Sequence, residues 1–170
     1  MDEEAQRIVE RFQMQPHPEG GFFREVYRSG IELEHPSIPA DTSRRRSGST
    51  LIYFLLAGQA FSAFHRVVCS DEVWHLYGGG PLEVHTINAA GRHDRYVLTT
   101  AWDAGEPAAI VKAGDWQAAK LAPGARWAFC GCTVAPGFDF DDFEMPPASE
   151  LLAAYPKHAT VIRELTRDQA

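Results

Sequence analysis

Two residues suited to proton transfer or metal binding, His65 and Glu72, stand on consecutive strand-like segments of the sequence. In residues 61–67 (FSAFHRV), every second side chain shares one face, and that face is apolar except for His65. In the next segment Glu72 shares a face with Trp74 and Leu76. A buried carboxylate is costly unless it is paired. We therefore expect His65 and Glu72 to meet inside the protein as partners.

A histidine beside a carboxylate is suited to acid–base chemistry on a small molecule. In this hypothesis His65 is the base, its pKa is held near neutrality by Glu72, and Tyr53 or Tyr77 is the acid. Side chains that could line the same ligand pocket are Tyr53, Phe61, Trp74, His75, Tyr77, Trp116 and Gln117. Among them, the two tryptophans offer flat surfaces for a sugar-like molecule. His75 reaches the pocket only if a bulge turns it inward, because it lies three positions after Glu72.

Two other functions remain open for the same residues. A mostly apolar pocket with a few polar groups can hold a small ligand without converting it. His65 and Glu72 can also be a buried polar pair with no further function. The sequence alone leaves open whether the protein is an enzyme.

The elements that position these residues are predicted to be antiparallel strands. Between residues 50 and 134, short β-forming segments alternate with Gly, Pro, Asn and Asp turns, which indicates a sandwich or barrel. Short helices are expected at about residues 2–14 and after residue 146. We expect one domain over residues 1–170 with a barrel core at about 20–145. The polar stretch 29–48 is expected to be a lid, a dimer arm or a solvated loop, with its Arg44–Arg46 run facing solvent.

Composition excludes several classes of partner. The 170-residue chain has a formal net charge of −7, which argues against nucleic acid and against an anionic membrane surface. It begins with the acidic, amphipathic MDEEAQRIVE rather than a secretory signal, and it has no apolar run of about 18 residues. A cytoplasmic location is expected. Cys69, Cys130 and Cys132 have no disulfide-framework spacing, so we expect buried thiols.

The chain resembles the cupin superfamily, with its RmlC-like jelly rolls, and within it the single-domain branch known as cupin family five. This resemblance implies a mainly β, antiparallel jelly-roll barrel, commonly a homodimer, that holds a small molecule inside, but it implies no particular reaction. The matching stretches are HPEGGFFREVYRS (17–29), STLIYFLLAGQAFSAFHRVVCSDEVWHLYGGGPLEVH (49–85), AGDWQAAK (113–120) and GCTVAPGFDFDDFE (131–144). In the first stretch, His17 and Glu19 are expected to serve a Pro/Gly turn.

The resemblance also implies an incomplete metal site. The first cupin motif places two histidines, a glutamate and a glycine, and here His65, Val67, Glu72 and Gly79 stand at those positions. In the second motif Gln117 replaces the histidine. A divalent transition metal (iron, nickel, manganese or zinc) would then lie on His65, Glu72 and Gln117, and act as a Lewis acid or activate oxygen.

Overall fold

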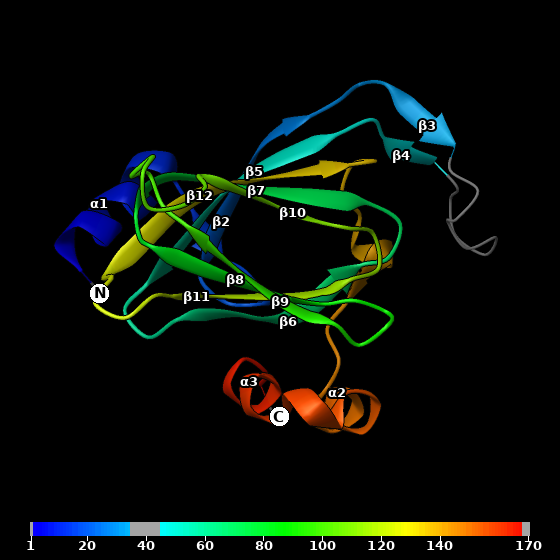
Figure 1. The fold of residues 1–170 in the computed structure, drawn as a ribbon. Coiled ribbons are helices and arrows are strands. Elements are labelled where there is room, and N and C mark those ends of the chain that lie inside the picture. Colours follow the sequence, from blue (N-terminus) through cyan, green and yellow to red (C-terminus); the bar gives the residue numbers. More distant parts are fainter. Residues whose placement is uncertain (1, 35–44, 168–170) are drawn as a thin grey trace.

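The computed structural model describes residues 2–34 and 45–167, and they form two facing antiparallel sheets (Figure 1). The six-stranded sheet has the order β1 (Gln15–Pro16), β2 (Phe22–Arg28), β5 (Thr50–Ala57), β12 (Trp127–Ala135), β7 (Asp71–Gly79) and β10 (Ala108–Val111). The five-stranded sheet has the order β13 (Phe143–Glu144), β6 (Phe61–Val67), β11 (Trp116–Leu121), β8 (Leu82–Ile87) and β9 (His93–Leu98). The mainly β jelly-roll prediction is confirmed. The barrel is not closed, however, because no described strand pairs one sheet with the other.

The core lies between the sheets and follows the predicted alternation of side chains. On β7, Glu72, Trp74 and Leu76 are buried, while Tyr77 is exposed. Phe54 and Leu56 of β5 face the same interior, where they pack with Trp74 and Leu76. Alternation along each strand therefore brings polar Glu72 into an otherwise apolar layer.

A β-bulge in β6 changes which side chains face this interior. Gln117 of β11 pairs with His65, whereas Ala119 pairs with Ser62, so two residues of β6 oppose one of β11. Because of the extra residue, Phe61 packs on the outer face of the sheet, against the C-terminal helices. The prediction that Phe61 shares the face of His65 was therefore wrong: a bulge reverses the alternation on which it relied.

Helices cover the outer faces of both sheets. Helix α1 (Glu3–Phe12) is capped by Asp2, whose Oδ1 accepts the Glu4 N–H at 3.0 Å, and its Ala5 packs on Leu55 of β5. Helices α2 (Ala148–Ala154) and α3 (Ala159–Glu164), joined by the short helix η2 (Pro156–His158), lie under the five-stranded sheet (Figure 1). None of the described helices is both long and apolar enough to cross a membrane.

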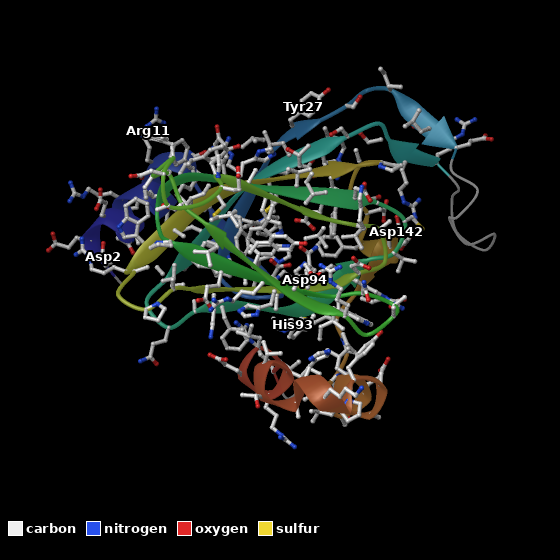
Figure 2. The ribbon with its side chains drawn as sticks, in the orientation of Figure 1. Asp2, Arg11, Tyr27, His93, Asp94 and Asp142 are labelled. Carbon is white, nitrogen blue, oxygen red and sulfur yellow. The ribbon has the colours of Figure 1, made fainter. Side chains whose placement is uncertain are left out.

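The stretch 29–48 contains a small hairpin of β3 (Glu32–Glu34) and β4 (Arg45–Ser47). Arg46 does not face solvent as predicted. Its Nε and Nη2 donate to the carboxylate of Asp142 at 2.7 and 2.9 Å, and both side chains are buried. Asp142 belongs to the short helix η1 (Phe140–Asp142), at the end of the sandwich from which the hairpin extends (Figure 2). Residues 35–44, including Arg44, lie outside the described part of the chain.

Candidate functional site

A cavity of about 90 Å³ lies between the sheets, at the end near η1. Four phenylalanines and three aliphatic side chains form most of its wall: Phe23, Ile52, Val67, Val134, Phe138, Phe140 and Phe143. Its polar lining is His17, Glu19, Glu25, Arg28, Thr50, His65, Glu72 and Cys132. An apolar enclosure with a few convergent polar groups is the usual form of a small-molecule site.

Glu72 reaches the cavity from β7 and is held there by a bond from the opposite sheet. Gln117 Nε2, on β11, donates to Glu72 Oε2 at 2.6 Å, and Gln117 Oε1 accepts the indole N–H of Trp74 at 2.8 Å. The second bond fixes the direction of the amide, so that its N–H group must face Glu72. Burial raises the pKa of Glu72, while nearby His65 and the Gln117 amide lower it.

His65 and Glu19 form a buried pair beside Glu72. His65 Nδ1 lies 2.8 Å from the carbonyl oxygen of Ala63 and therefore donates to it. This leaves Nε2 as the acceptor in the neutral ring, and Nε2 lies 3.2 Å from Glu19 Oε2. Burial raises the pKa of Glu19 to about 8 and lowers that of His65. At neutral pH, therefore, the shared proton resides on Glu19.

The turn between β1 and β2 carries His17 and Glu19 into the cavity. The carbonyl oxygen of Glu19 accepts the N–H of Ala63 at 2.8 Å, and Glu19 Oε1 accepts the hydroxyl of Ser62 at 2.9 Å. Gly20 has φ +119°, and a Cβ there would collide with the carbonyl oxygen of Phe61. The turn can approach β6 this closely only because that position is glycine.

His65 and Glu72 both line the cavity, but they do not pair as predicted. Glu72 accepts a hydrogen bond from Gln117, and the carboxyl oxygen that lies against His65 Nε2, at 3.2 Å, belongs to Glu19. Glu19, which lies against His65, comes from the turn at residues 17–21, far away in the sequence. His65 and Glu72 are nevertheless close enough for each charge to shift the pKa of the other. Gln117 lies behind Glu72 and does not line the cavity.

The other predicted ligand-binding residues lie outside this cavity. Trp74 is fully buried in the core, and Phe61 and Trp116 pack near the C-terminal helices. On the outer face of the six-stranded sheet, Tyr53 packs near α1 and His75 lies 3.1 Å from Thr133 Oγ1 and stacks on Tyr77. A ligand in the cavity would not touch these six residues, because sheet alternation and the β6 bulge turn five of them outward and the sixth, Trp74, is enclosed by core residues.

His17, Glu19 and Cys132 line the cavity although their sequence positions did not predict it. The HPEGG stretch carried a signal, since two successive glycines allow a backbone to approach its neighbour closely. Cys132 is buried, as predicted for the thiols, and burial raises its pKa well above the usual value. A protonated thiol is a weak nucleophile, so Cys132 is suited to a structural role.

The residues present do not fit the predicted metal site. Val67 offers no ligand atom. Gln117 directs Oε1 to the Trp74 N–H and turns toward Glu72 only its N–H group, which cannot bind a metal. His65 Nε2 faces Glu19 rather than an open position shared with Glu72. Over residues 2–34 and 45–167, no three His, Cys, Asp or Glu side chains are placed to hold one ion.

Two solved structures have the same fold as this chain over nearly its whole length. A hypothetical protein from Leishmania major is 29% identical, with a TM-score of 0.87 over 96% of this chain and 99% of its own. A protein from Shewanella oneidensis is 34% identical, with a TM-score of 0.85 over 97% of this chain and 98% of its own. An uncharacterized protein from Saccharomyces cerevisiae is 27% identical over 81% of this chain and 72% of its own length.

Similarity to cupin enzymes is confined to the fold. Oxalate decarboxylase from Bacillus subtilis, whose Mn(II) centres have been studied, is 14% identical and has a TM-score of 0.53. The family model described as "Cupin superfamily (DUF985)" matches residues 6–146. The chain therefore belongs to this family of the cupin superfamily.

Proposed function

We propose that the cavity binds a small organic molecule and transfers a proton on it, with Glu72 as the base and the Glu19–His65 pair as the acid. One observation carries this proposal: two buried carboxyl groups share one cavity in opposite hydrogen-bonding surroundings. When two titratable groups in one site have different surroundings, their pKa values differ, and one can act as the acid while the other acts as the base.

The surroundings of Glu72 favour its carboxylate form. The Gln117 N–H at 2.6 Å is a short donor, typical of a hydrogen bond to a charged oxygen. Burial at the same time raises the pKa of Glu72, which makes it a stronger base than an exposed carboxylate. Glu72 would therefore accept a proton from bound substrate.

The surroundings of Glu19 favour its protonated form. Its Oε2 faces His65 Nε2 at 3.2 Å and His17 Nδ1 at 3.4 Å, and both ring nitrogens are acceptors when neutral. A carboxylic acid at this position can donate its single O–H to His65 Nε2, whereas a carboxylate would repel the lone pairs of both nitrogens. Glu19 would return a proton to the substrate and regain one through His65.

The size and walls of the cavity limit the substrate. A volume of about 90 Å³ suits a compact molecule, and the two carboxyl groups are only 5% and 7% exposed among the phenylalanine walls. The Arg28–Glu25 ion pair, at 2.7 Å and half-exposed, belongs to the same lining. Its opposite charges cancel, so we expect the substrate to be small and without net charge.

The proposal is tested by solvent deuterium exchange into hydroxyacetone and dihydroxyacetone, followed by NMR. Wild-type protein should accelerate exchange, and Glu72→Gln and Glu19→Gln should each lower the rate by at least about 100-fold, the usual contribution of a positioned acid or base. Glu83→Gln is the matched control, because Glu83 is also a buried carboxylate but pairs with Arg95 away from the cavity. Binding of either probe without exchange would instead support a ligand-binding module.

A homodimer and a cytoplasmic location remain predictions. The homodimer is supported by exposed apolar side chains along β2 and the adjoining hairpin, Val26, Tyr27, Ile31 and Leu33 (Tyr27 is labelled in Figure 2). Sedimentation velocity should give twice the chain mass, and Tyr27→Glu should shift the protein toward the monomer. A wild-type monomer at micromolar concentration would contradict the dimer.

A further inference from the structure

The hydrogen bonds of His17 determine which of its nitrogens carries the proton. The backbone N–H of Glu19 points at His17 Nδ1 at 3.3 Å, and the protonated Glu19 Oε2 lies 3.4 Å from the same nitrogen. The backbone N–H is a donor, so Nδ1 must be the acceptor. In a neutral ring the single N–H is then on Nε2.

His17 Nε2 is free to bind a ligand. Among the described residues, no group forms a hydrogen bond with Nε2. The atom is also not fully buried, so a ligand can reach it. The side chain lines the cavity and is only 6% exposed. Its accessible N–H is therefore directed to the cavity rather than to bulk solvent.

The ring of His17 is rigidly held and stays neutral. Phe23, Phe54 and Phe143 contact it edge to face, with ring centroids 4.5, 6.1 and 6.2 Å away. Burial, together with nearby His65, lowers the pKa of His17 to about 4. A neutral imidazole of fixed tautomer is an electrophile that polarises a carbonyl without releasing its own proton as a strong acid would.

We propose that His17 donates its Nε2 hydrogen to a carbonyl oxygen of the substrate, and that the substrate is a small ketone or aldehyde with a hydrogen on the adjacent carbon. This inference rests on the proposed proton transfer and names its substrate class. His17 is then a catalytic residue, since it touches the oxygen on which negative charge develops.

The step conserves atoms and electrons without an added reagent. Glu72 takes the proton from the adjacent carbon, the C–H electron pair forms a carbon–carbon double bond, and the carbonyl electrons move onto oxygen. The resulting enolate oxygen is stabilised by the His17 N–H. A proton then returns to the same carbon, either from Glu19 or from Glu72 after exchange with solvent, and the carbonyl re-forms, which completes the exchange. Protons alone are transferred, so no oxidant or reductant is needed.

Deuterium exchange into hydroxyacetone tests the catalytic role of His17. Loss of one donor to a developing oxyanion typically lowers a rate by about 10²–10³. His17→Leu should show that loss, whereas His17→Gln, whose amide N–H reaches a position similar to Nε2, should retain more of the rate. His93→Leu is the matched control, because His93 contacts His85 and His158 away from the cavity and should leave the rate unchanged.

A second measurement reports on the carbonyl itself. Infrared difference spectra of ¹³C-carbonyl hydroxyacetone should show the bound carbonyl band at lower frequency than in water. In Glu72→Gln, which does not turn over, the shift should persist, and in the His17→Leu, Glu72→Gln double variant it should disappear. Circular dichroism and thermal unfolding establish that each variant is folded.

The outcomes separate this inference from the proposed function. Exchange that needs Glu72 but is unchanged in His17→Leu would overturn the role of His17 and leave the proposed function standing. A His17-dependent band shift without any wild-type exchange would overturn the proposed function and retain carbonyl recognition. The absence of any band shift in wild-type protein would overturn carbonyl recognition.

Discussion

The indole N–H of Trp74 donates to Gln117 Oε1 at 2.8 Å, and this single bond determines what the cavity offers to a ligand. With its oxygen occupied, Gln117 can present only its N–H group to Glu72. The residue that stands at a cupin metal-ligand position thus becomes a donor that orients a carboxylate. Glutamine in place of the motif's histidine at position 117 thus removes a metal ligand and supplies a donor to the carboxylate of an acid–base site.

Gln117→Leu should change both stability and pH dependence. It removes the donor to Glu72 and leaves the buried Trp74 N–H without an acceptor, which should cost about 1–3 kcal/mol of unfolding free energy. Because the Gln117 bond lowers the pKa of Glu72, its loss should raise that pKa and move the acidic limb of the exchange profile to higher pH. Urea unfolding and the pH–rate profile measure the two effects, and an unshifted limb would contradict the role of Gln117.

Glu19→Gln should make the protein more stable at high pH relative to wild type. The folded-state pKa of Glu19 is about 8, above its ordinary 4.5, so its contribution is fully present below pH 4.5 and lost as pH rises through about 8. This loss amounts to roughly 1 kcal/mol per pH unit. Glutamine keeps the hydrogen-bonding atoms but cannot ionise. Unfolding measured from pH 5 to 9 should show the difference between variant and wild type growing with pH, and a constant difference would rule out a raised pKa.

Gly20→Ala should displace the turn that carries His17 and Glu19. Its φ of +119° is strained for alanine, and the added Cβ would collide with the Phe61 carbonyl oxygen. We expect a loss of about 2 kcal/mol or more, together with most of the exchange activity. Gly124→Ala is the control, since it has φ +88° and nothing within 4 Å, and should cost only about 1 kcal/mol. Equal losses in both variants would contradict the close approach.

Asp142→Asn should destabilise the protein strongly, because it deprives the buried Arg46 guanidinium of its carboxylate. Breaking a buried ion pair from one side typically costs about 3–5 kcal/mol. The half-exposed pair of Arg66 and Glu144 gives the comparison, and Glu144→Gln should cost at most about 1 kcal/mol. Thermal unfolding of the two variants decides the matter, and similar melting temperatures would be inconsistent with the burial of Arg46.

Chelation should leave deuterium exchange unchanged, because the geometry of Gln117 and Val67 does not fit a metal. Elemental mass spectrometry of wild-type protein should detect no near-stoichiometric iron, nickel, manganese or zinc. Such a metal, lost in both His65→Ala and Glu72→Ala, would show that the ligand set rearranges around an ion and would refute the metal-free mechanism.

The amino-acid sequence by itself determined the strand pattern and part of the site. Alternation along β7 placed Glu72 and Trp74 inward and His75 outward, as the structure confirms. The spacing of apolar and turn residues likewise predicted antiparallel sheets with helices at both ends, because these features depend on neighbours along the chain. His65 and Glu72 were correctly expected inside the protein for the same reason.

Only the tertiary structure decided which polar groups meet. The β6 bulge, which moved Phe61 away from the face of His65, is set by pairing with β11 and has no local signature. The contact of His65 with Glu19 requires a turn about 45 residues earlier to close onto Ala63, and the orientation of Gln117 requires Trp74 from the opposite sheet. Hydrogen bonds between distant segments depend on register and packing, which local sequence patterns do not encode.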